Sequence, residues 1–156
     1  MAGIIGGIFL VLVCLDMGIK QYIDDSWKEG EERETLIPRL VLRKVYNCGF
    51  ALNALEKRPE IVRGVSGAAC LWVFFYDLWL FLQKGKRLRK LSMALVSAGA
   101  VSNTYDRLVR RKVIDYIGFR TKFQYLSQLT ANLADFYVAA GAALVSLCNV
   151  GKKKKR

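Results

Sequence analysis

Four long apolar stretches, separated by charged segments, constrain this chain more than any other feature. They fall at residues 1–15, 64–76, 91–105 and 136–150. A helix needs roughly 20 mostly apolar residues to cross a bilayer core about 30 Å thick, and each stretch approaches that length if one or two polar residues are admitted. The sequence therefore predicts an all-α membrane protein, a single domain over residues 1–156, with four transmembrane helices at residues 3–22, 64–83, 91–105 and 128–150.

The segments between the predicted spans differ in character. Residues 24–63 form an outer segment whose first part, residues 24–34, is acidic and should be solvated. Residues 35–55 mix apolar and basic side chains in a pattern that suits short strands or an interfacial layer. The third and fourth spans are rich in Gly, Ala and Ser, which let helix backbones approach closely, so we expect these two helices to touch.

The distribution of charge predicts how the chain sits in the membrane. Of its 25 Lys and Arg residues, many gather in residues 84–90 and in the basic tail 151–156. Short basic segments beside apolar spans mark the cytoplasmic side and attract anionic lipid headgroups. Both termini are therefore expected in the cytoplasm. The net charge of +12 does not predict nucleic-acid binding, because no basic stripe with interleaved aromatic residues is present on a soluble module.

The N-terminal stretch resembles a signal peptide only in its hydrophobicity. It has no Lys or Arg before its apolar run, and no convincing small-residue cleavage site follows. We expect it to be a retained span.

The residue types that are missing narrow the possible chemistry. The chain has no histidine and no Cys-x-x-Cys pair, which argues against a zinc site and against a Ser-His triad. Hydrolysis would then depend on carboxylates, hydroxyls, thiols or lysines, with no metal or organic cofactor.

Acidic residues interrupt the apolar stretches, although a carboxylate at the bilayer centre costs about 2.5–3.5 kcal/mol. Asp16 and Lys20 stand four residues apart on one helical face, which predicts an internal salt bridge of structural value. Asp77 is expected to make a local polar contact. Asp106 precedes Arg107 directly, and a structural or substrate-orienting role is expected for it.

Asp115 and Asp135 have apolar neighbours and no adjacent cation. If the third and fourth spans pack together, both carboxylates can meet near the outer membrane boundary. Two close carboxyls in a low dielectric hold one shared proton, as in aspartic proteases, where one takes a proton from water and the other polarises the scissile carbonyl. We predict that these two residues are catalytic.

Short motifs along the chain resemble those of the signal peptidase II family, the lipoprotein signal peptidases. They are D-x-x-x-K at Asp16 to Lys20, N-x-G-x-A beginning at Asn47 and including Gly49, N-x-x-D-R at Asn103 to Arg107, V-x-D-[FY] at Val113 to Tyr116, and N-x-A-D at Asn132 to Asp135. Their order and the span pattern make the resemblance specific over nearly the whole chain.

The resemblance implies a four-helix bacterial cell-membrane endopeptidase with a small extracytoplasmic β-rich cradle. Such an enzyme cuts lipid-modified prolipoproteins just before the diacylglyceryl-cysteine. By position, Asp115 and Asp135 would be the catalytic pair, near the extracytoplasmic face. The residues that would bind substrate or support the site are Asn47, Gly49, Asn103, Asp106, Arg107 and Asn132, whereas Asp16 and Lys20 would be structural. Ser102 and Ala131 depart from the family's usual glycine and aromatic residue.

Two other functions remain open at the level of sequence. Intramembrane acids also serve proton-coupled or cation-coupled transporters, although those place their acids near the bilayer midplane. A non-catalytic relative could bind lipoproteins without cutting them, but it would be free to lose one acid, and both are present.

Overall fold

The computed structural model describes residues 2–50, 54–122, 127 and 129–153. Each predicted span corresponds to one long helix in this part of the chain. The helices are α1 (Ala2–Ser26), α2 (Pro59–Leu82), α3 (Arg87–Tyr105) and α5 (Leu133–Lys153). A short π-helical turn, η2 (Asp106–Arg110), continues α3.

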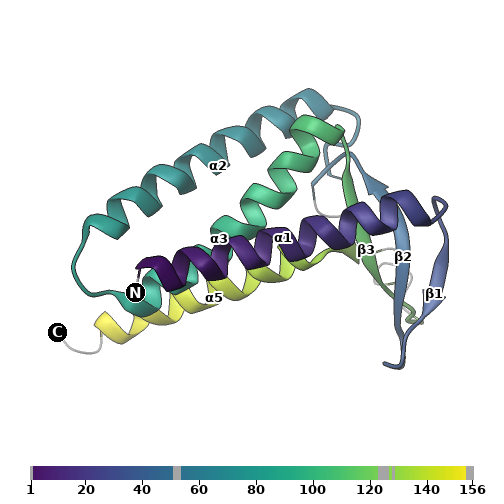
Figure 1. The fold of residues 1–156 in the computed structure, drawn as a ribbon. Coiled ribbons are helices and arrows are strands. Elements are labelled where there is room, and N and C mark those ends of the chain that lie inside the picture. Colours follow the sequence, from purple (N-terminus) through teal and green to yellow (C-terminus); the bar gives the residue numbers. More distant parts are fainter. Residues whose placement is uncertain (1, 51–53, 123–126, 128, 154–156) are drawn as a thin grey trace.

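Helix α3 is the centre of the bundle and packs against α1, α2 and α5 (Figure 1). The predicted contact between the small-residue helices is present as the close approach of α3 and α5. A Cβ atom added to Gly99 would clash with the backbone oxygen of Ala134, and one added to Gly141 would stand 2.6 Å from the backbone oxygen of Ser92. Glycine is therefore required at both positions by backbone proximity.

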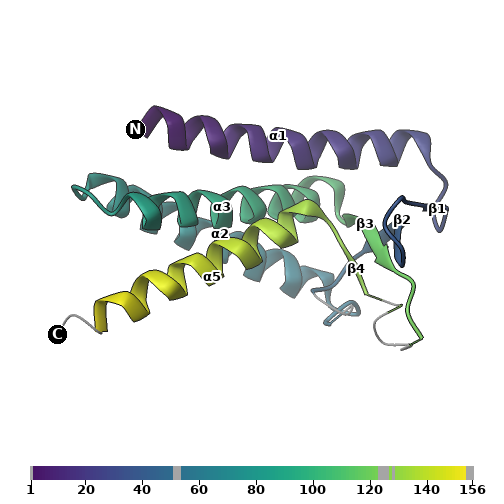
Figure 2. The ribbon, with the colours of Figure 1, turned by 90° about the horizontal axis from the view of Figure 1, so that it is seen from below.

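A four-stranded antiparallel sheet covers one end of the bundle. Its strands follow the order β1 (Glu32–Glu34), β2 (Leu40–Asn47), β3 (Val113–Phe119) and β4 (Thr130–Ala131). The start of α1, the end of α5 and the turn between α2 and α3 all lie at the opposite end of the bundle (Figures 1 and 2).

Several boundaries differ from the sequence prediction; for example, α1 continues to Ser26 beyond residue 22, and α3 begins at Arg87 before residue 91. Strand β1 lies within the acidic stretch that was expected to be solvated, and its Glu32 forms ion pairs with Arg43 of β2 and with Arg120, which follows β3. Helix α5 begins at Leu133 rather than at residue 128, since residues 130–131 pair with β3 instead. Helix α2 begins at Pro59, before residue 64, and proline is well suited to the first helical position.

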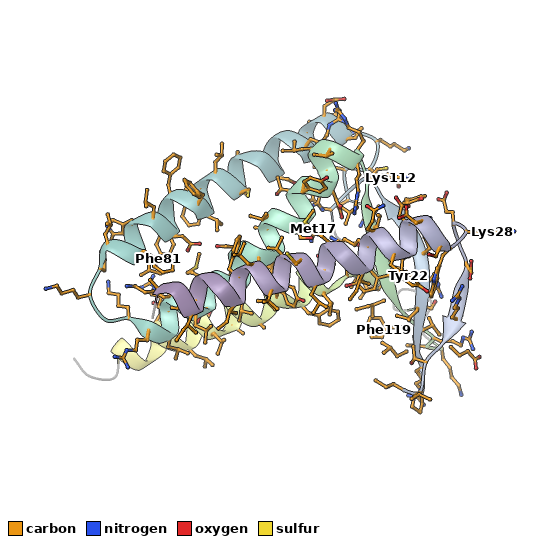
Figure 3. All side chains as sticks on the ribbon, viewed as in Figure 1. Met17, Tyr22, Lys28, Phe81, Lys112 and Phe119 are labelled. Atoms are coloured by element: carbon orange, nitrogen blue, oxygen red, sulfur yellow. The ribbon has the colours of Figure 1, made fainter. Side chains whose placement is uncertain are left out.

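Helices α1 and α2 are long and apolar enough to cross a membrane. Their outer faces carry large apolar side chains, and on α2 these include the exposed Trp72, Phe74 and Phe75. Figure 3 shows such side chains projecting outward from the helices, with Phe81 at one end and the charged Lys28 and Lys112 towards the sheet. Many exposed large apolar side chains of this kind suit contact with lipid rather than water.

Candidate active site

Strand β3 carries Asp115 towards the interior. Because side chains alternate along a strand, Ile114 and Tyr116 face one side and Asp115 the other. Ile114 and Tyr116 pack with Ile23 and Trp27, near the end of α1, in a buried apolar cluster. Asp115 consequently lines a cavity on the other side, and only 2% of its surface is exposed.

Asp135 is fixed by a reciprocal cap at the start of α5. The backbone N–H of Asn132 donates to Asp135 Oδ2 (3.1 Å), and the backbone N–H of Asp135 donates to Asn132 Oδ1 (3.2 Å). This is a capping box, in which residues three apart satisfy each other's free N–H groups. A carboxylate is also electrostatically favoured at a helix N-terminus. The Asn-x-x-Asp spacing therefore sets the position of the Asp135 carboxylate.

Three asparagine side chains hold the two carboxylates. The Nδ2 group of Asn132 donates to Asp115 Oδ1 (2.7 Å), so this one residue contacts both acids. The Nδ2 group of Asn47 donates to Asp115 Oδ2 (3.1 Å). The Nδ2 group of Asn103 donates to Asp135 Oδ1 (2.8 Å). Each carboxylate thus has one asparagine of its own and shares Asn132 with the other.

Both acids line a cavity of about 670 Å³ between α2, α3, α5 and the sheet. Most of its wall is apolar and includes Val65, Ala69, Val73, Phe136, Val138 and Ala139. The cavity can therefore receive an apolar group and present it to two carboxyls and a small set of polar donors.

The electrostatics make Asp115 easier to protonate than a free aspartate. Burial raises the pKa of Asp115 above its usual range, the hydrogen bond from Asn47 opposes this shift, and the nearby charge of Asp135 adds to it. A carboxyl that is easier to protonate can act as an acid beside a second carboxyl. Such a pair can supply a base and an acid to the same reaction.

Arg107 connects the cavity to the turn after β2. Its guanidinium donates to the backbone oxygen of Gly49 (3.2 Å) and lies over the ring of Phe50, 5.4 Å from the centroid. Asn47 accepts a hydrogen bond from the Gly49 backbone N–H (2.8 Å). The turn at Gly49 is thereby anchored to Asn47 and Arg107, both of which line the cavity.

A second polar cluster is buried between α1, α3 and η2. Lys20 Nζ lies 2.8 Å from Asp16 Oδ2, the ion pair that their spacing predicts, and 2.9 Å from Asp106 Oδ2. All three residues are fully buried. Asp106 also pairs with Arg110, so it belongs to this cluster and not to the residues that line the cavity. Asp77 accepts a hydrogen bond from Ser97 on α3, which is the local polar contact expected for it.

The residues that the structure describes contain no group of three or more His, Cys, Asp or Glu side chains placed to hold a metal ion. The polar groups that line this cavity are the two carboxyls, the amides of Asn47 and Asn103, the guanidinium of Arg107, and the hydroxyl and thiol groups of Ser66, Cys70, Thr104 and Thr130.

Comparison with known proteins identifies the family. The profile described as signal peptidase (SPase) II matches residues 8–150. The chain belongs to the signal peptidase II family. The lipoprotein signal peptidase of Sinorhizobium fredii is 32% identical over 147 residues, which cover 94% of this chain and 86% of that protein. The lipoprotein signal peptidase of Fusobacterium nucleatum is 26% identical over 149 residues, which cover 96% and 87% of the two chains.

Solved structures share the fold. A bacterial membrane enzyme determined by the in meso method at 2.3 Å resolution superposes with a TM-score of 0.84 at 20% sequence identity, over 99% of this chain and 92% of that one. A second structure, at 1.9 Å resolution, gives a TM-score of 0.76 over 94% and 92% of the two chains. The fold is therefore shared along almost the full length of the chain.

Three polar residues near the signal peptidase II motifs were not assigned a role from the sequence. Thr130 Oγ1 lies 3.3 Å from Asp115 Oδ2. Tyr116 donates to Asp16 Oδ1 (2.9 Å) and accepts from the Leu133 backbone N–H (3.0 Å), so it ties α1 to the start of α5. Ser102, noted only as a departure, donates to Asp16 Oδ2 (2.6 Å). The position of Thr130 two residues before Asn132 is the one local signal that could have found it.

Proposed function

We propose that this chain is a lipoprotein signal peptidase, which cuts lipid-modified prolipoproteins before the diacylglyceryl-cysteine with Asp115, Asp135 and a water molecule. The observation that carries the proposal is the position of Asn132, which holds both carboxylates at one apolar cavity. Membership of the signal peptidase II family and the names of the relatives support the choice of substrate.

The arrangement suits attack by water on a peptide carbonyl. One carboxylate accepts a proton from the water as its oxygen bonds to the carbonyl carbon, and the protonated partner donates to the carbonyl oxygen. The apolar cavity wall would receive the lipid or the apolar signal segment. The amides of Asn47, Asn103 and Asn132 keep the carboxyls in place, and Arg107 with Gly49 borders the substrate's path.

We propose that all four helices cross the bacterial plasma membrane, with both termini in the cytoplasm and the sheet as an extracytoplasmic cradle. The start of α1, the end of α5 and the basic α2–α3 turn lie at one end of the bundle, and the sheet lies at the other (Figures 1 and 2). Basic residues favour the cytoplasmic side, where they also meet anionic headgroups.

Single cysteines introduced into a variant without natural cysteines test this topology. In intact cells, or in spheroplasts where an outer membrane is present, a membrane-impermeant thiol reagent should label Leu36→Cys, next to β1, without permeabilisation. Lys84→Cys, in the turn between α2 and α3, should react only after the membrane is opened. Labelling of Lys84→Cys in intact cells would reverse the orientation.

The substrate class is tested with purified protein in liposomes. A diacylglyceryl-modified prolipoprotein should be cut before its modified cysteine, and the same precursor without the lipid should be cut at least about tenfold more slowly, since the lipid's binding energy is lost. Equal cleavage of both forms would remove the proposed specificity. No cleavage of the lipidated precursor would favour a non-catalytic binder, and ion flux through the same liposomes would favour a transporter.

A further inference from the structure

Ser66 on α2 is a buried serine whose hydroxyl has no hydrogen-bond partner within the described part of the chain. The residue is 7% exposed and lines the cavity that holds Asp115 and Asp135. An unpaired polar group in an apolar wall is unfavourable, since it has lost its hydrogen bonds to water and gained none in return. The hydroxyl of Ser66 is therefore available to a partner that enters the cavity.

The other buried serines of the described helices are all paired. Ser92 donates to the backbone oxygen four residues earlier in α3 (2.7 Å), which is a bond open to any serine inside a helix. Ser97 donates to the Asp77 carboxylate, and Ser102 donates to the Asp16 carboxylate. The unpaired hydroxyl of Ser66 is thus a property of this position and not of serines in this bundle.

Ser66 lies near the two carboxyls of the candidate active site. The hydroxyl of Thr104, on α3, is 3.4 Å from the backbone oxygen of Ser66, and both residues line the cavity. Thr104 directly follows Asn103, whose amide donates to Asp135 (2.8 Å). The contact between α2 and α3 therefore brings Ser66 to the part of the cavity where the acids are.

The wall that α2 contributes to the cavity becomes apolar beyond Ser66. Helix α2 begins at the sheet and runs away from it (Figure 1). The lining residues that follow Ser66 along the helix are Ala69, Cys70 and Val73. Their spacing of three and four residues places them on one helical face. A hydroxyl near the acids is thus followed by an apolar surface that leads away from them.

Arg107 supplies the other buried lining atom without a partner among the described residues, its Nε. Its guanidinium is held on the sheet side of the cavity by the Gly49 backbone and the Phe50 ring. It also interacts electrostatically with Asp115 and Asp135. Arg107 therefore belongs with the acids, whereas Ser66 is the hydroxyl donor of the α2 wall.

We propose that the Ser66 hydroxyl donates a hydrogen bond to an ester carbonyl of the substrate's diacylglyceryl group, whose acyl chain lies against Ala69, Cys70 and Val73. This rests on the proposed function. An ester carbonyl accepts hydrogen bonds and cannot donate them, so it matches a hydroxyl with a proton to give. It is also the last polar group before an acyl chain, and the α2 wall has polar and apolar groups in that order.

The test compares two precursors that differ only in their lipid. One carries ester-linked chains, and the other carries ether-linked chains of the same length, which have no carbonyl oxygen. The kcat/KM of the full chain in liposomes is measured for both. We expect the ratio of ester to ether cleavage to be about three- to tenfold higher in the wild type than in Ser66→Ala, because one neutral hydrogen bond is lost. The ether precursor should be cut equally by both proteins.

Two results would overturn the assignment of Ser66. If Ser66→Ala cuts both precursors at the wild-type rate, the hydroxyl does not contact the substrate. If the substitution slows both precursors equally, the hydroxyl serves a peptide group or the packing of α2, and not the ester.

Two further variants control for size and for general disturbance of the bundle. Ser66→Cys keeps a side chain of similar size but offers only a weak donor, so its ratio should fall towards that of Ser66→Ala. Ser92→Ala removes a buried serine hydroxyl of α3 that does not line the cavity, and its ratio should equal that of the wild type. An equal fall in Ser92→Ala would contradict a specific role for Ser66.

Infrared spectroscopy tests the contact without cleavage. The Asp115→Asn protein is mixed with a precursor whose ester carbonyls are isotopically labelled, since a hydrogen bond lowers the frequency of a carbonyl band. We expect a low-frequency ester band that is lost when Ser66→Ala is added. Absence of this band before Ser66 is replaced would overturn the proposed contact. A band that depends on Ser66, in a protein whose wild-type form cuts no precursor, would support the lipid site and count against the proposed function.

Discussion

Asp115→Asn and Asp135→Asn are each expected to lower the rate of precursor cleavage by about a thousandfold or more, because each removes one half of the acid–base pair. An asparagine can keep hydrogen bonds to its neighbours, but it cannot take a proton from water or hold the shared one. The rate is measured in liposomes with a lipidated precursor, at enzyme concentrations high enough to detect single turnovers.

Asp25→Asn is the matched control for these variants. Asp25 is exposed near the end of α1, and its carboxylate accepts hydrogen bonds from the Gln21 side chain, which lies outside the cavity. Its replacement should leave the rate unchanged. If folded Asp115→Asn or Asp135→Asn protein cleaved the precursor at the wild-type rate, the two residues would not act as a catalytic pair.

Thermal unfolding at several pH values shows whether the Asp115→Asn protein is folded. Burial raises the pKa of Asp115, so the folded state binds this proton more tightly than the unfolded state. Its contribution to stability is therefore present at low pH and is lost as pH rises from about 4 through the raised pKa. Asparagine does not titrate, so the stability of Asp115→Asn relative to the wild type should increase over that pH range.

Asn132→Ala is expected to have the second-largest effect, since this residue both caps α5 and contacts the two acids. Loss of the cap should lower the free energy of unfolding by about 1–2 kcal/mol. Loss of the amide donor to Asp115 should lower kcat by at least about tenfold, because a hydrogen bond to a charged group contributes about 1.5–3 kcal/mol. Melting temperature and single-turnover rate together separate the two effects.

Two further substitutions separate capping from catalysis. Asn132→Asp keeps an acceptor for the Asp135 backbone N–H but places a third carboxyl beside Asp115, so the cap should survive while activity falls. Asn149→Ala, at an exposed position of the same helix, should change stability by less than about 0.5 kcal/mol and leave activity intact. Normal activity in Asn132→Asp would show that its amide is not needed.

The helices could be predicted from the sequence because an apolar stretch long enough to cross a membrane can adopt few structures other than a helix. Their ends were less predictable, since local pairing determines them. Residues 130–131 were predicted to belong to the fourth span, but they form a strand that pairs with β3. Strand β1 was not recognisable from hydropathy, because its Glu32 is stabilised by Arg43 of the next strand and by Arg120, which lies far along the chain.

The motifs predicted most residues of the candidate site, but they did not predict the hydrogen bonds that connect those residues. The Asn132–Asp135 capping box is local and follows from the spacing. The contact of Tyr116 with Asp16 joins residues 100 positions apart, and nothing in the local pattern predicts it. The link from Lys20 through Asn103 to Asp135 is equally non-local.

The most direct test of the two-carboxylate account is an experimental structure of the protein in a lipid mesophase, at a resolution that shows ordered water. We expect one water molecule within hydrogen-bonding distance, about 3.2 Å or less, of both Asp115 and Asp135. Carboxyl groups that point apart, with no water able to contact both, would contradict the account.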